Sequence, residues 1–409
     1  MTTTGYSVFL IVTVFVALEI GLRVFFVIQT GHRAFLYGTE GYRNHVIQQK
    51  QKARDNWYRK RDITVELHKN DLEGYSKFFP NEVKVDKNPD TGETFTVTMN
   101  SRGFRGREFA DSKGDAIRIL TLGSSSTFDY YNKDETTYPY LLEEMLNTRC
   151  TQGKRFEVIN FAIPHSTSAM IASLFLAEGL PLEPDYITIY SGSNDSQIQK
   201  PGPEESFVHW AYKWLLERLL LVKYLDYLVQ YRSSAAINEF DDAYARERSA
   251  VFLRNLETIS QAARSNGIQL IVANQQRKST MVERSQMKGI NYKTEVEMVR
   301  DKLNATGVLT AREASFLIHN VMMVDLESRV MQRGIPFVDI IRLLDNDRDR
   351  LLSWVHLDPM ANREIARAFS GVILEEACSA DNMDAGDSDM QVQLPSSWRQ
   401  TSPGGVYPD

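Results

Sequence analysis

Five short apolar runs, separated by stretches of helical periodicity, constrain the fold of this chain more than any other feature. The runs are rich in β-branched residues and lack strict alternation of apolar and polar side chains. They lie at residues 117–123, 156–162, 186–192, 267–274 and 334–340. These properties are typical of strands buried on both faces of a parallel sheet. Alternation of such strands with helices predicts an α/β fold with right-handed crossovers.

The stretches between the runs supply the helices. Residues 137–147 place their apolar side chains on one face, residues 168–180 follow the second run, and residues 248–267 precede the fourth. Residues 207–232 are polar on one half of the helical wheel, and mostly apolar or aromatic elsewhere. Three interpretations of this last stretch stay open: an amphipathic helix packed on the sheet, a lid over an active site, or an element at a membrane surface.

The N-terminal segment is a candidate membrane anchor. Residues 7–28 are apolar except for Glu19 and Arg23, and a helix of this length spans roughly 33 Å, enough to cross a bilayer. The two charges are four residues apart on one helix face, so we expect them to pair with each other or with a partner helix. No basic side chain precedes the segment, which disfavours a cleaved signal peptide. We predict one uncleaved transmembrane helix within residues 1–30; a buried amphipathic helix and a cleaved signal are the alternatives.

Composition and motif content restrict the possible partners. The net charge of −6 excludes the strongly basic balance of a nucleic-acid-binding protein. Cys150 and Cys378, the two cysteines, form one disulfide or none, so they leave the redox compartment open. The sequence contains no metal-ligand spacing and no glycine-rich phosphate-binding loop, so we expect neither a metal nor a nucleotide cofactor.

Two polar regions flank the predicted sheet. Residues 31–115 form a lead-in, with a short strand pattern and a turn-rich basic connector near 94–109. The α/β domain then covers residues 116–379, with a helical insertion near 200–247. Residues 380–409 are acidic and then rich in Pro, Ser and Gly, which predicts a disordered tail.

Polar side chains gather where several of the predicted strands end, which is where an open parallel sheet places its functional groups. The four segments concerned are Gly123–Thr127, Asn160–Ala162, Gly192–Asp195 and Ser353–His356. A serine hydroxyl is a weak nucleophile and needs an adjacent base. The imidazole of His356 suits that role because it titrates near neutral pH.

Taken in order, the four segments resemble the sequence blocks of the SGNH (GDSL-like) hydrolase superfamily, including its membrane-anchored bacterial members. The likeness covers roughly residues 116–377. It implies a flavodoxin-like sheet, a nucleophile at Ser125 and a base at His356. It also implies an oxyanion hole made by the backbone N–H groups of Ser125 and Ala162 and the side-chain amide of Asn194. Gly192 and Asp195, in the third block, are possible supporting residues.

Three positions depart from the family pattern. Ser124 stands where the family has an aspartate beside the nucleophile, and Ala162 stands where it has a glycine. Ser353 replaces the aspartate three residues before the histidine, which is the serious change because a carboxylate there orients the imidazole and stabilises its charged form. Three nearby carboxylates are candidates to replace it: Asp347, Asp349 and Asp358. Alternatively, a backbone carbonyl completes a Ser–His dyad. We expect a slower enzyme.

The resemblance implies hydrolysis of a small acyl ester on a carbohydrate or lipid. Two other classes stay open: an O-acyltransferase acting on a polysaccharide, and a weak or inactive binding or assembly subunit. The resemblance also favours an extracytoplasmic catalytic domain. However, the flank at residues 33–61 is rich in Lys and Arg, which taken alone favours the cytoplasm. We predict the extracytoplasmic side.

Overall fold

The computed structural model describes most of the predicted α/β domain and the N-terminal helix. The described residues are 3–30, 65–68, 75–88, 91–150, 152–197, 214–215, 219–222 and 240–378. The predicted tail, the basic flank and most of the predicted insertion lie outside them. The chain divides into two compact units, which are described separately. One contains residues 1–64, 197–240 and 302–315, and the other contains residues 65–196, 241–301 and 316–409.

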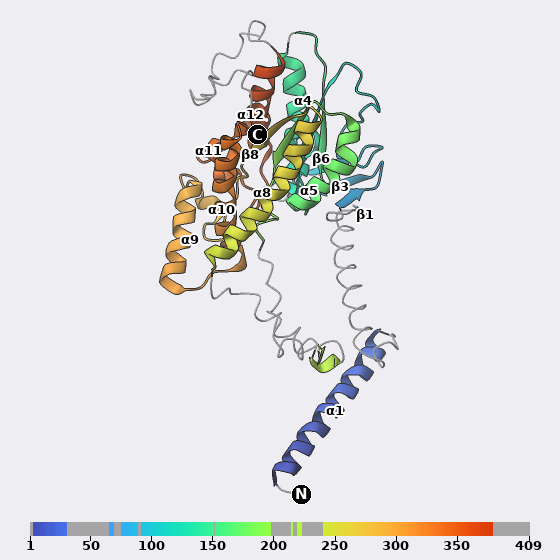
Figure 1. The fold of residues 1–409 in the computed structure, drawn as a ribbon, viewed down its shortest axis with the longest axis vertical. Helices are drawn as coiled ribbons and strands as arrows, with labels where there is room; N and C mark the ends of the chain where they lie inside the picture. The colour runs from blue at the N-terminus through green and yellow to red at the C-terminus, as the bar shows by residue number, and fades with distance from the viewer. Residues whose placement is uncertain are drawn as a thin grey trace. The chain divides into compact units, whose positions relative to one another are not determined.

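The larger unit is built on a five-stranded parallel sheet (Figure 1). Its strands are β5 (Ile117–Gly123), β6 (Phe156–Ala162), β7 (Tyr186–Tyr190), β8 (Gln269–Ala273) and β9 (Phe337–Val338). They lie in the order β6-β5-β7-β8-β9, with every neighbouring pair parallel. Numbered along the chain, this is the 2-1-3-4-5 order of flavodoxin-like sheets. The predicted fold class is therefore confirmed.

The first two strands match the predicted residues, and the last three are shorter than predicted. In β7, pairing stops at Tyr190, and Gly192 beyond it has φ +140°. A side chain at that glycine would also approach the Met323 methyl group to 2.7 Å. Only glycine adopts such a conformation readily, so the chain leaves the sheet here and turns into the third sequence block.

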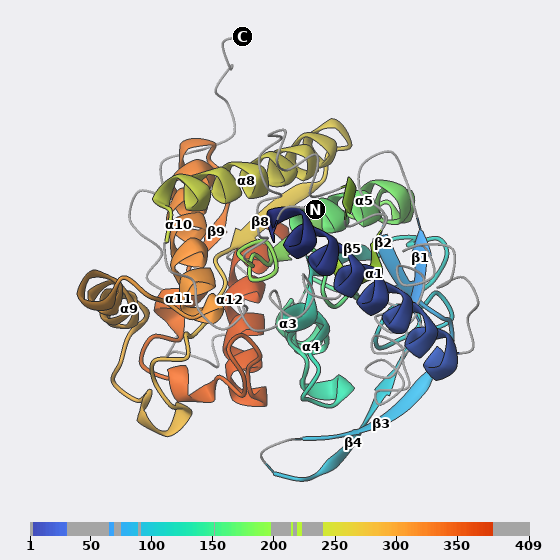
Figure 2. The ribbon, with the colours of Figure 1, turned by 90° about the horizontal axis from the view of Figure 1, so that it is seen from below.

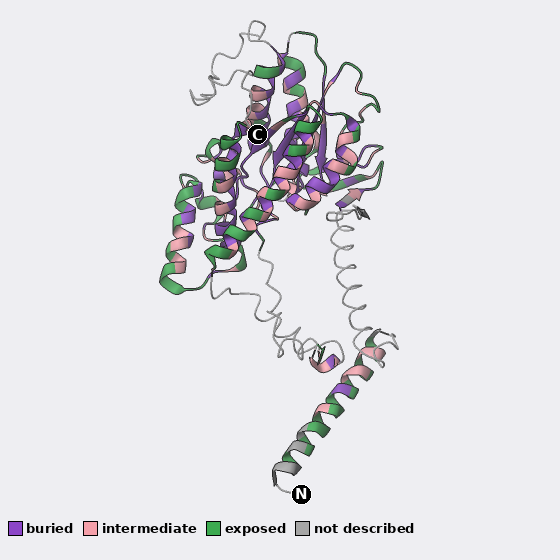
Figure 3. Ribbon diagram, in the orientation of Figure 1, coloured by how far each residue is buried: buried purple, intermediate pink, exposed green. Residues whose placement is uncertain are grey.

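Helices cover both faces of the sheet. The helices α4 (Tyr138–Arg149) and α12 (Pro359–Ala377) pack against each other, and their apolar side chains share one core with Ile119 of β5 and Ile271 of β8. On the other face, Ile189 of β7 lies with apolar side chains of α8 (Asp242–Ser265) and α10 (Ala311–Gln332). Figure 3 shows the strands as buried and the outer sides of these helices as exposed.

The remaining helices differ in part from the predicted ones. The stretch predicted at 168–180 is α5 (Ser168–Leu174), followed by a π-helical turn η3 (Phe175–Gly179) and a 3₁₀ turn η4 (Leu180–Leu182). Helix α8 begins six residues before its predicted start, because Asp241 caps it by accepting a hydrogen bond from the Ala243 N–H at 2.7 Å. Helices α10 and α9 (Tyr292–Thr306) had no counterpart in the prediction. The short helical elements are α3 (Ser125–Phe128), η2 (Asp134–Thr136), η5 (Arg284–Gln286), α11 (Ile340–Leu343) and η6 (Arg348–Arg350).

The described part of the polar lead-in forms two small antiparallel sheets. One pairs β1 (Val65–His68) with β2 (Tyr75–Phe78), and the other pairs β3 (Val83–Lys87) with β4 (Thr94–Thr98). Figure 2 shows the β3–β4 hairpin as a ribbon outside the five-stranded sheet. These strands belong to the same compact unit as the sheet.

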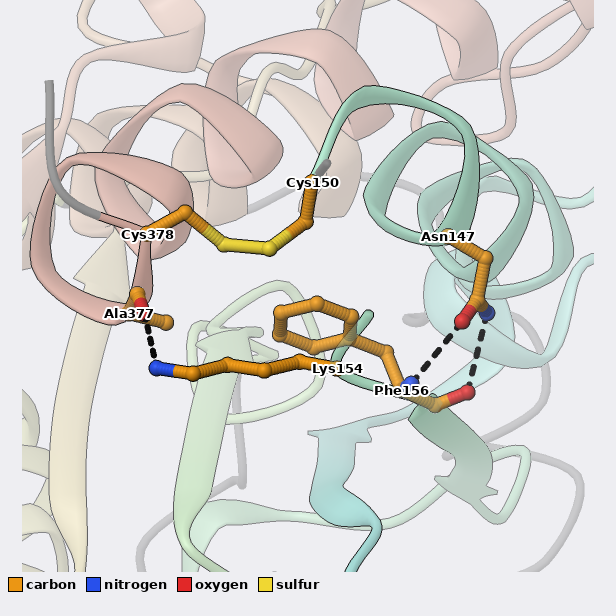
Figure 4. The surroundings of a disulfide bond; sticks show 6 residues. All are labelled: Asn147, Cys150, Lys154, Phe156, Ala377 and Cys378. Carbon is orange, nitrogen blue, oxygen red and sulfur yellow. Dashed lines mark hydrogen bonds between the residues drawn. A yellow bond between two sulfur atoms is a disulfide. The ribbon is translucent and has the colours of Figure 1, made fainter. Parts of the chain in front are cut away.

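Cys150 and Cys378 form a disulfide (Figure 4), which settles a pairing that the sequence left open. The bond joins the C-terminal end of α4 to that of α12. Lys154 Nζ donates a hydrogen bond to the carbonyl of Ala377, and Asn147 exchanges two 2.9 Å hydrogen bonds with the backbone of Phe156. The disulfide therefore lies in a part of the larger unit that these hydrogen bonds also hold together.

The smaller unit contains α1 (Thr3–Thr30). Its stretch Val12–Gln29 is long and apolar enough to cross a membrane, and most of its side chains are exposed (Figure 3). Glu19 and Arg23 form the predicted ion pair at 2.7 Å.

Candidate active site

Ser125 lies where β5 ends and α3 begins, and it is the accessible residue of its loop. All residues from Arg118 to Tyr130 are buried except Ser125, which is partly exposed. The turn is tight: a side chain on Gly123 would come within 2.1 Å of Thr127 Oγ1 and 2.9 Å of the Tyr190 carbonyl. The glycine of this block thus allows the strand to enter the helix directly, with Ser125 at the turn.

The segment that follows Ser125 is held in place by two buried polar side chains. Arg105, from the lead-in, pairs with Asp134 at 2.7 Å and donates to the carbonyls of Phe128 and Asn132 at 2.8 and 2.7 Å. Asn160, of the second block, donates its amide to the carbonyl of Thr127 at 3.2 Å. The lead-in is therefore more than a spacer, because its arginine braces the segment that follows Ser125.

The terminal loop brings His356 to the same end of the sheet. Ser126 Oγ, next to the predicted nucleophile, donates to the carbonyl of Val355 at 3.3 Å. The imidazole is buried, with 6% of the residue exposed. It is flanked by the rings of Tyr130 and Tyr131, whose centroids lie 5.7 and 5.0 Å from it. The first and last sequence blocks therefore lie next to each other.

The direct contact between nucleophile and base stays a prediction. Within the described ranges, Ser125 Oγ forms no hydrogen bond with the His356 ring. The neighbouring contact between Ser126 and Val355 brings the two chain segments side by side. A catalytic hydrogen bond of this kind often shortens only when substrate binds.

Ser353 occupies the position of the missing carboxylate. Its Oγ lies 2.7 Å from His356 Nδ1 and accepts the backbone N–H groups of Val355 at 3.3 Å and of His356 at 3.1 Å. These two donors occupy both lone pairs of the hydroxyl oxygen, so its own hydrogen is the one left to face Nδ1. In that arrangement Nδ1 accepts and Nε2 carries the ring proton. The state that a general base needs, with Nε2 unprotonated, requires the hydroxyl to accept from Nδ1 in place of one backbone N–H.

Two of the three carboxylates considered as replacements, those of Asp358 and Asp347, serve other contacts. Asp358 caps α12, accepting the backbone N–H of Ala361 at 2.8 Å, and lies 3.4 Å from Arg350. Asp347 lies 3.8 Å from the same arginine. The backbone carbonyl of Asp349 accepts a hydrogen bond from Arg284 at 2.7 Å. Within the described ranges, none of the three carboxylates hydrogen-bonds the imidazole.

Asn194 comes from the third block and reaches the nucleophile loop. Its Nδ2 donates to Ser124 Oγ at 2.6 Å and to the carbonyl of Ser166 at 2.9 Å. Ser124, the residue that replaces the family aspartate, is therefore an acceptor for this amide. Because both amide hydrogens have acceptors, an oxyanion that used Asn194 would take over the hydrogen now directed at Ser124.

The other predicted site residues surround the same strand ends. Ala162 is paired in register with Gly123. Asp195 accepts the backbone N–H of Ser168 at 2.9 Å and also its hydroxyl, so it holds the start of α5. Burial raises the pKa of Asp195 to about 6. His165, three residues after the second block, is exposed and has φ +65°.

Gln275 is a functional candidate that the sequence reasoning missed. It is buried at the end of β8, where its Nε2 donates to Ser126 Oγ at 3.0 Å and its Oε1 accepts the Ser193 N–H at 2.7 Å. It thus joins the first block to the third. The signal was present: residues 274–277 are a polar run after a predicted strand, and all four are buried.

The chain is similar to several solved structures at low sequence identity. No family model matches the chain, and no curated protein matches it. Among solved structures, it is similar to a putative lipolytic protein of the G-D-S-L family from Desulfitobacterium hafniense, at 12% identity and TM-score 0.38, covering 63% of this chain and 99% of that one. It is also similar to a GDSL-like lipase from Bacteroides thetaiotaomicron, at 12% identity and TM-score 0.37, covering 65% and 92%.

A third similar structure is an acetylxylan esterase from Geobacillus stearothermophilus, at 13% identity and TM-score 0.36, covering 62% of this chain and 91% of that one. At such low identity and score, these structures do not identify a reaction. The chemistry of this chain is therefore argued from its own side chains.

Proposed function

We propose that the chain is a serine hydrolase that cleaves acyl esters, with Ser125 as nucleophile and His356 as general base. The observation that carries the proposal is the hydrogen bond between Ser126 and the carbonyl of Val355 at 3.3 Å. It joins the residue after the partly exposed serine to the residue before the histidine, although 229 positions separate them along the chain.

In the proposed reaction, His356 Nε2 takes the proton of the Ser125 hydroxyl as its oxygen attacks the ester carbonyl carbon. The carbonyl oxygen becomes an oxyanion, which the N–H groups of Ser125 and Ala162 and the amide of Asn194 stabilise. Removal of one such donor typically costs about 2.7–4 kcal/mol. The intermediate then expels the alcohol, which receives its proton from the imidazolium. Water next attacks the acyl-serine, with the same imidazole as base, and releases the acid.

The hydroxyl of Ser353 supports the imidazole without supplying charge. It can hold the productive tautomer through its 2.7 Å contact with Nδ1 only by accepting the ring proton in place of one of its two backbone N–H donors, and it cannot stabilise the imidazolium as a carboxylate does. We expect slow turnover for this reason. The same substitution favours a second candidate, a binding or assembly subunit with weak or no catalysis.

The proposed substrate is a small acyl ester on a carbohydrate or lipid. Transfer of the acyl group to a polysaccharide hydroxyl, in place of water, is the alternative reaction. Incubation of the labelled acyl-enzyme with water and with a sugar acceptor distinguishes the two reactions by their products.

We further propose that α1 anchors the chain in a membrane with the hydrolase domain on the extracytoplasmic side. The basic flank argues for the opposite orientation. The disulfide between Cys150 and Cys378 outweighs it, because reducing systems in the cytosol keep thiols reduced. In intact cells, both cysteines should resist a thiol reagent until a reductant is added; reaction without reductant would contradict this orientation.

Labelling with a fluorophosphonate tests the hydrolase proposal. Wild type should be labelled, and Ser125→Ala should not. Ser265→Ala, an exposed serine at the end of α8, is the matched control and should be labelled like wild type. A folded wild-type protein that takes no label would favour the binding subunit.

A further inference from the structure

The carboxylate of Glu19 makes contacts that a simple membrane anchor does not need. Only 7% of Glu19 is exposed, although α1 is mostly exposed. Besides its ion pair with Arg23, it accepts hydrogen bonds from the backbone N–H groups of Leu220 at 2.8 Å and Leu221 at 2.7 Å. The charged side chain of α1 therefore holds a second, distant segment of the chain.

The backbone at Leu220 needs these acceptors because a helical stretch begins there. Residues 220–222 are helical, whereas Leu219 is not. The first N–H groups of a helix have no partner within it, and a carboxylate at this end also interacts favourably with the helix dipole. In water, solvent satisfies such groups. In hydrocarbon, the protein itself must satisfy them.

An apolar contact accompanies the cap. Leu220 is fully buried, and the partly buried side chains of Leu22, Phe26 and Val27 pack against it. By contrast, Ile28 is 75% exposed. Helix α1 thus has one side that contacts the second segment and another that is free to contact lipid.

Glu19 lies well inside the apolar stretch of α1. It comes seven residues after Val12 and ten before Gln29, the ends of that stretch, which correspond to about 10 and 15 Å along the helix axis. We infer that residues 219–222 enter the hydrocarbon layer beside α1, with Glu19 as the intramembrane cap that makes this entry possible. The partner of the second segment is lipid hydrocarbon, and the chain is held in the bilayer at two places. This inference rests on the proposed anchoring of α1.

Accessibility of position 222 tests the inference directly, because Val222 lies in the same segment but, unlike Leu220, is only partly buried by protein. Val222→Cys is made in the full chain, in membranes opened so that both faces are accessible, and treated with a membrane-impermeant maleimide. The native cysteines are joined in a disulfide and do not compete. Val85→Cys, at a position 66% exposed in the larger unit, is the control. We expect labelling at 222 to be about tenfold slower or more, and to become fast in detergent, since bilayer hydrocarbon excludes the polar reagent. Equal rates in membranes would overturn the inference.

Crosslinking tests the role of Glu19. Leu22→Cys with Leu220→Cys should form a disulfide within one chain under mild oxidation, and Ile28→Cys with Leu220→Cys should not. Glu19→Leu makes α1 more apolar, so membrane attachment is kept while the cap is lost, and the crosslink should disappear. Glu19→Gln, which keeps one acceptor oxygen, should retain part of it. Full crosslinking in Glu19→Leu would show that the carboxylate does not hold the segment.

An alkaline carbonate wash separates the two proposals. Wild type that stays with the membrane supports the anchoring of α1. Release of wild type would refute the anchoring and, with it, this inference. Retention combined with rapid labelling at position 222 would refute the second membrane segment alone.

Discussion

Replacement of Ser353 by aspartate should make the proposed enzyme faster. Ser353 Oγ already lies 2.7 Å from His356 Nδ1, so a carboxylate at this position can accept the ring N–H. Its negative charge would then stabilise the imidazolium that forms as Ser125 loses its proton. Ser353→Asp thus adds the one charge that the site lacks.

The size of the gain follows from two opposing effects. Opposite charges about 4 Å apart attract by ~4 kcal/mol at an effective dielectric constant of about 20. Burial opposes this attraction, as the two buried carboxyls nearby indicate: desolvation raises the pKa of Asp129 and of Asp195 from 3.8 to about 6. A shift of that size corresponds to roughly 3 kcal/mol. The net stabilisation of about 1–2 kcal/mol predicts an increase in kcat/KM of roughly 5- to 30-fold.

Hydrolysis of p-nitrophenyl acetate by the detergent-solubilised full chain measures the effect. The gain should be present at pH 8, where the new carboxyl is ionised, and shrink at pH 5. Ser353→Asn, which has similar size but no charge, is the matched control and should be no faster than wild type. Addition of Ser125→Ala should abolish the gain. The reasoning is refuted if Ser353→Asp, Ser353→Asn and Ser353→Ala all hydrolyse at the wild-type rate.

Three further predictions concern the support of the site. Gln275→Leu should lower kcat by about tenfold or more and raise KM less, because loss of its hydrogen bonds to Ser126 and to the third block leaves buried polar groups unpaired. An unchanged kcat in a fully folded variant would show that these hydrogen bonds are dispensable. Replacement of Cys150 and Cys378 by serine should cost roughly 5 kcal/mol, given the 228-residue separation, and lower Tm by about 10–20 °C in calorimetry; a loss of only a few degrees would contradict this. Burial raises the pKa of Asp129 to about 6, so the native state holds its proton more tightly than the unfolded chain, and this residue should reduce stability as pH rises from about 4 to about 6. Asp129→Asn should remove the contribution of this carboxyl to the dependence of unfolding free energy on pH. An identical dependence in the variant would show that Asp129 does not contribute to it.

The sheet and the convergence of the first three blocks were predictable from the sequence for a simple physical reason, whereas the fourth block lies in a loop beyond the last strand. Strands buried on both faces must be apolar throughout, and the carboxyl ends of parallel strands meet at one edge. Helix α10 was not predicted because its buried residues, among them Phe316, Met322 and Leu326, do not form the clear stripe of a half-exposed helix.

The rest of the site depends on contacts that no local pattern encodes. Gln275 acts through hydrogen bonds to segments far away along the chain. The residue type at Ser353 was evident, but its contact with the imidazole requires the loop geometry. The disulfide stayed open because its partners are 228 residues apart, and spacing alone does not determine such a pairing.

The disulfide also has a consequence for the life of the protein after synthesis. The two cysteines are 228 residues apart, so the ring from Cys150 cannot close until the chain between them and Cys378 itself have been made. Once it has closed, a protease that cuts anywhere inside the ring produces two pieces that remain one covalent molecule. Such a nicked protein keeps Ser125 and His356 tied together, and it separates into fragments only when a reductant reaches the bond.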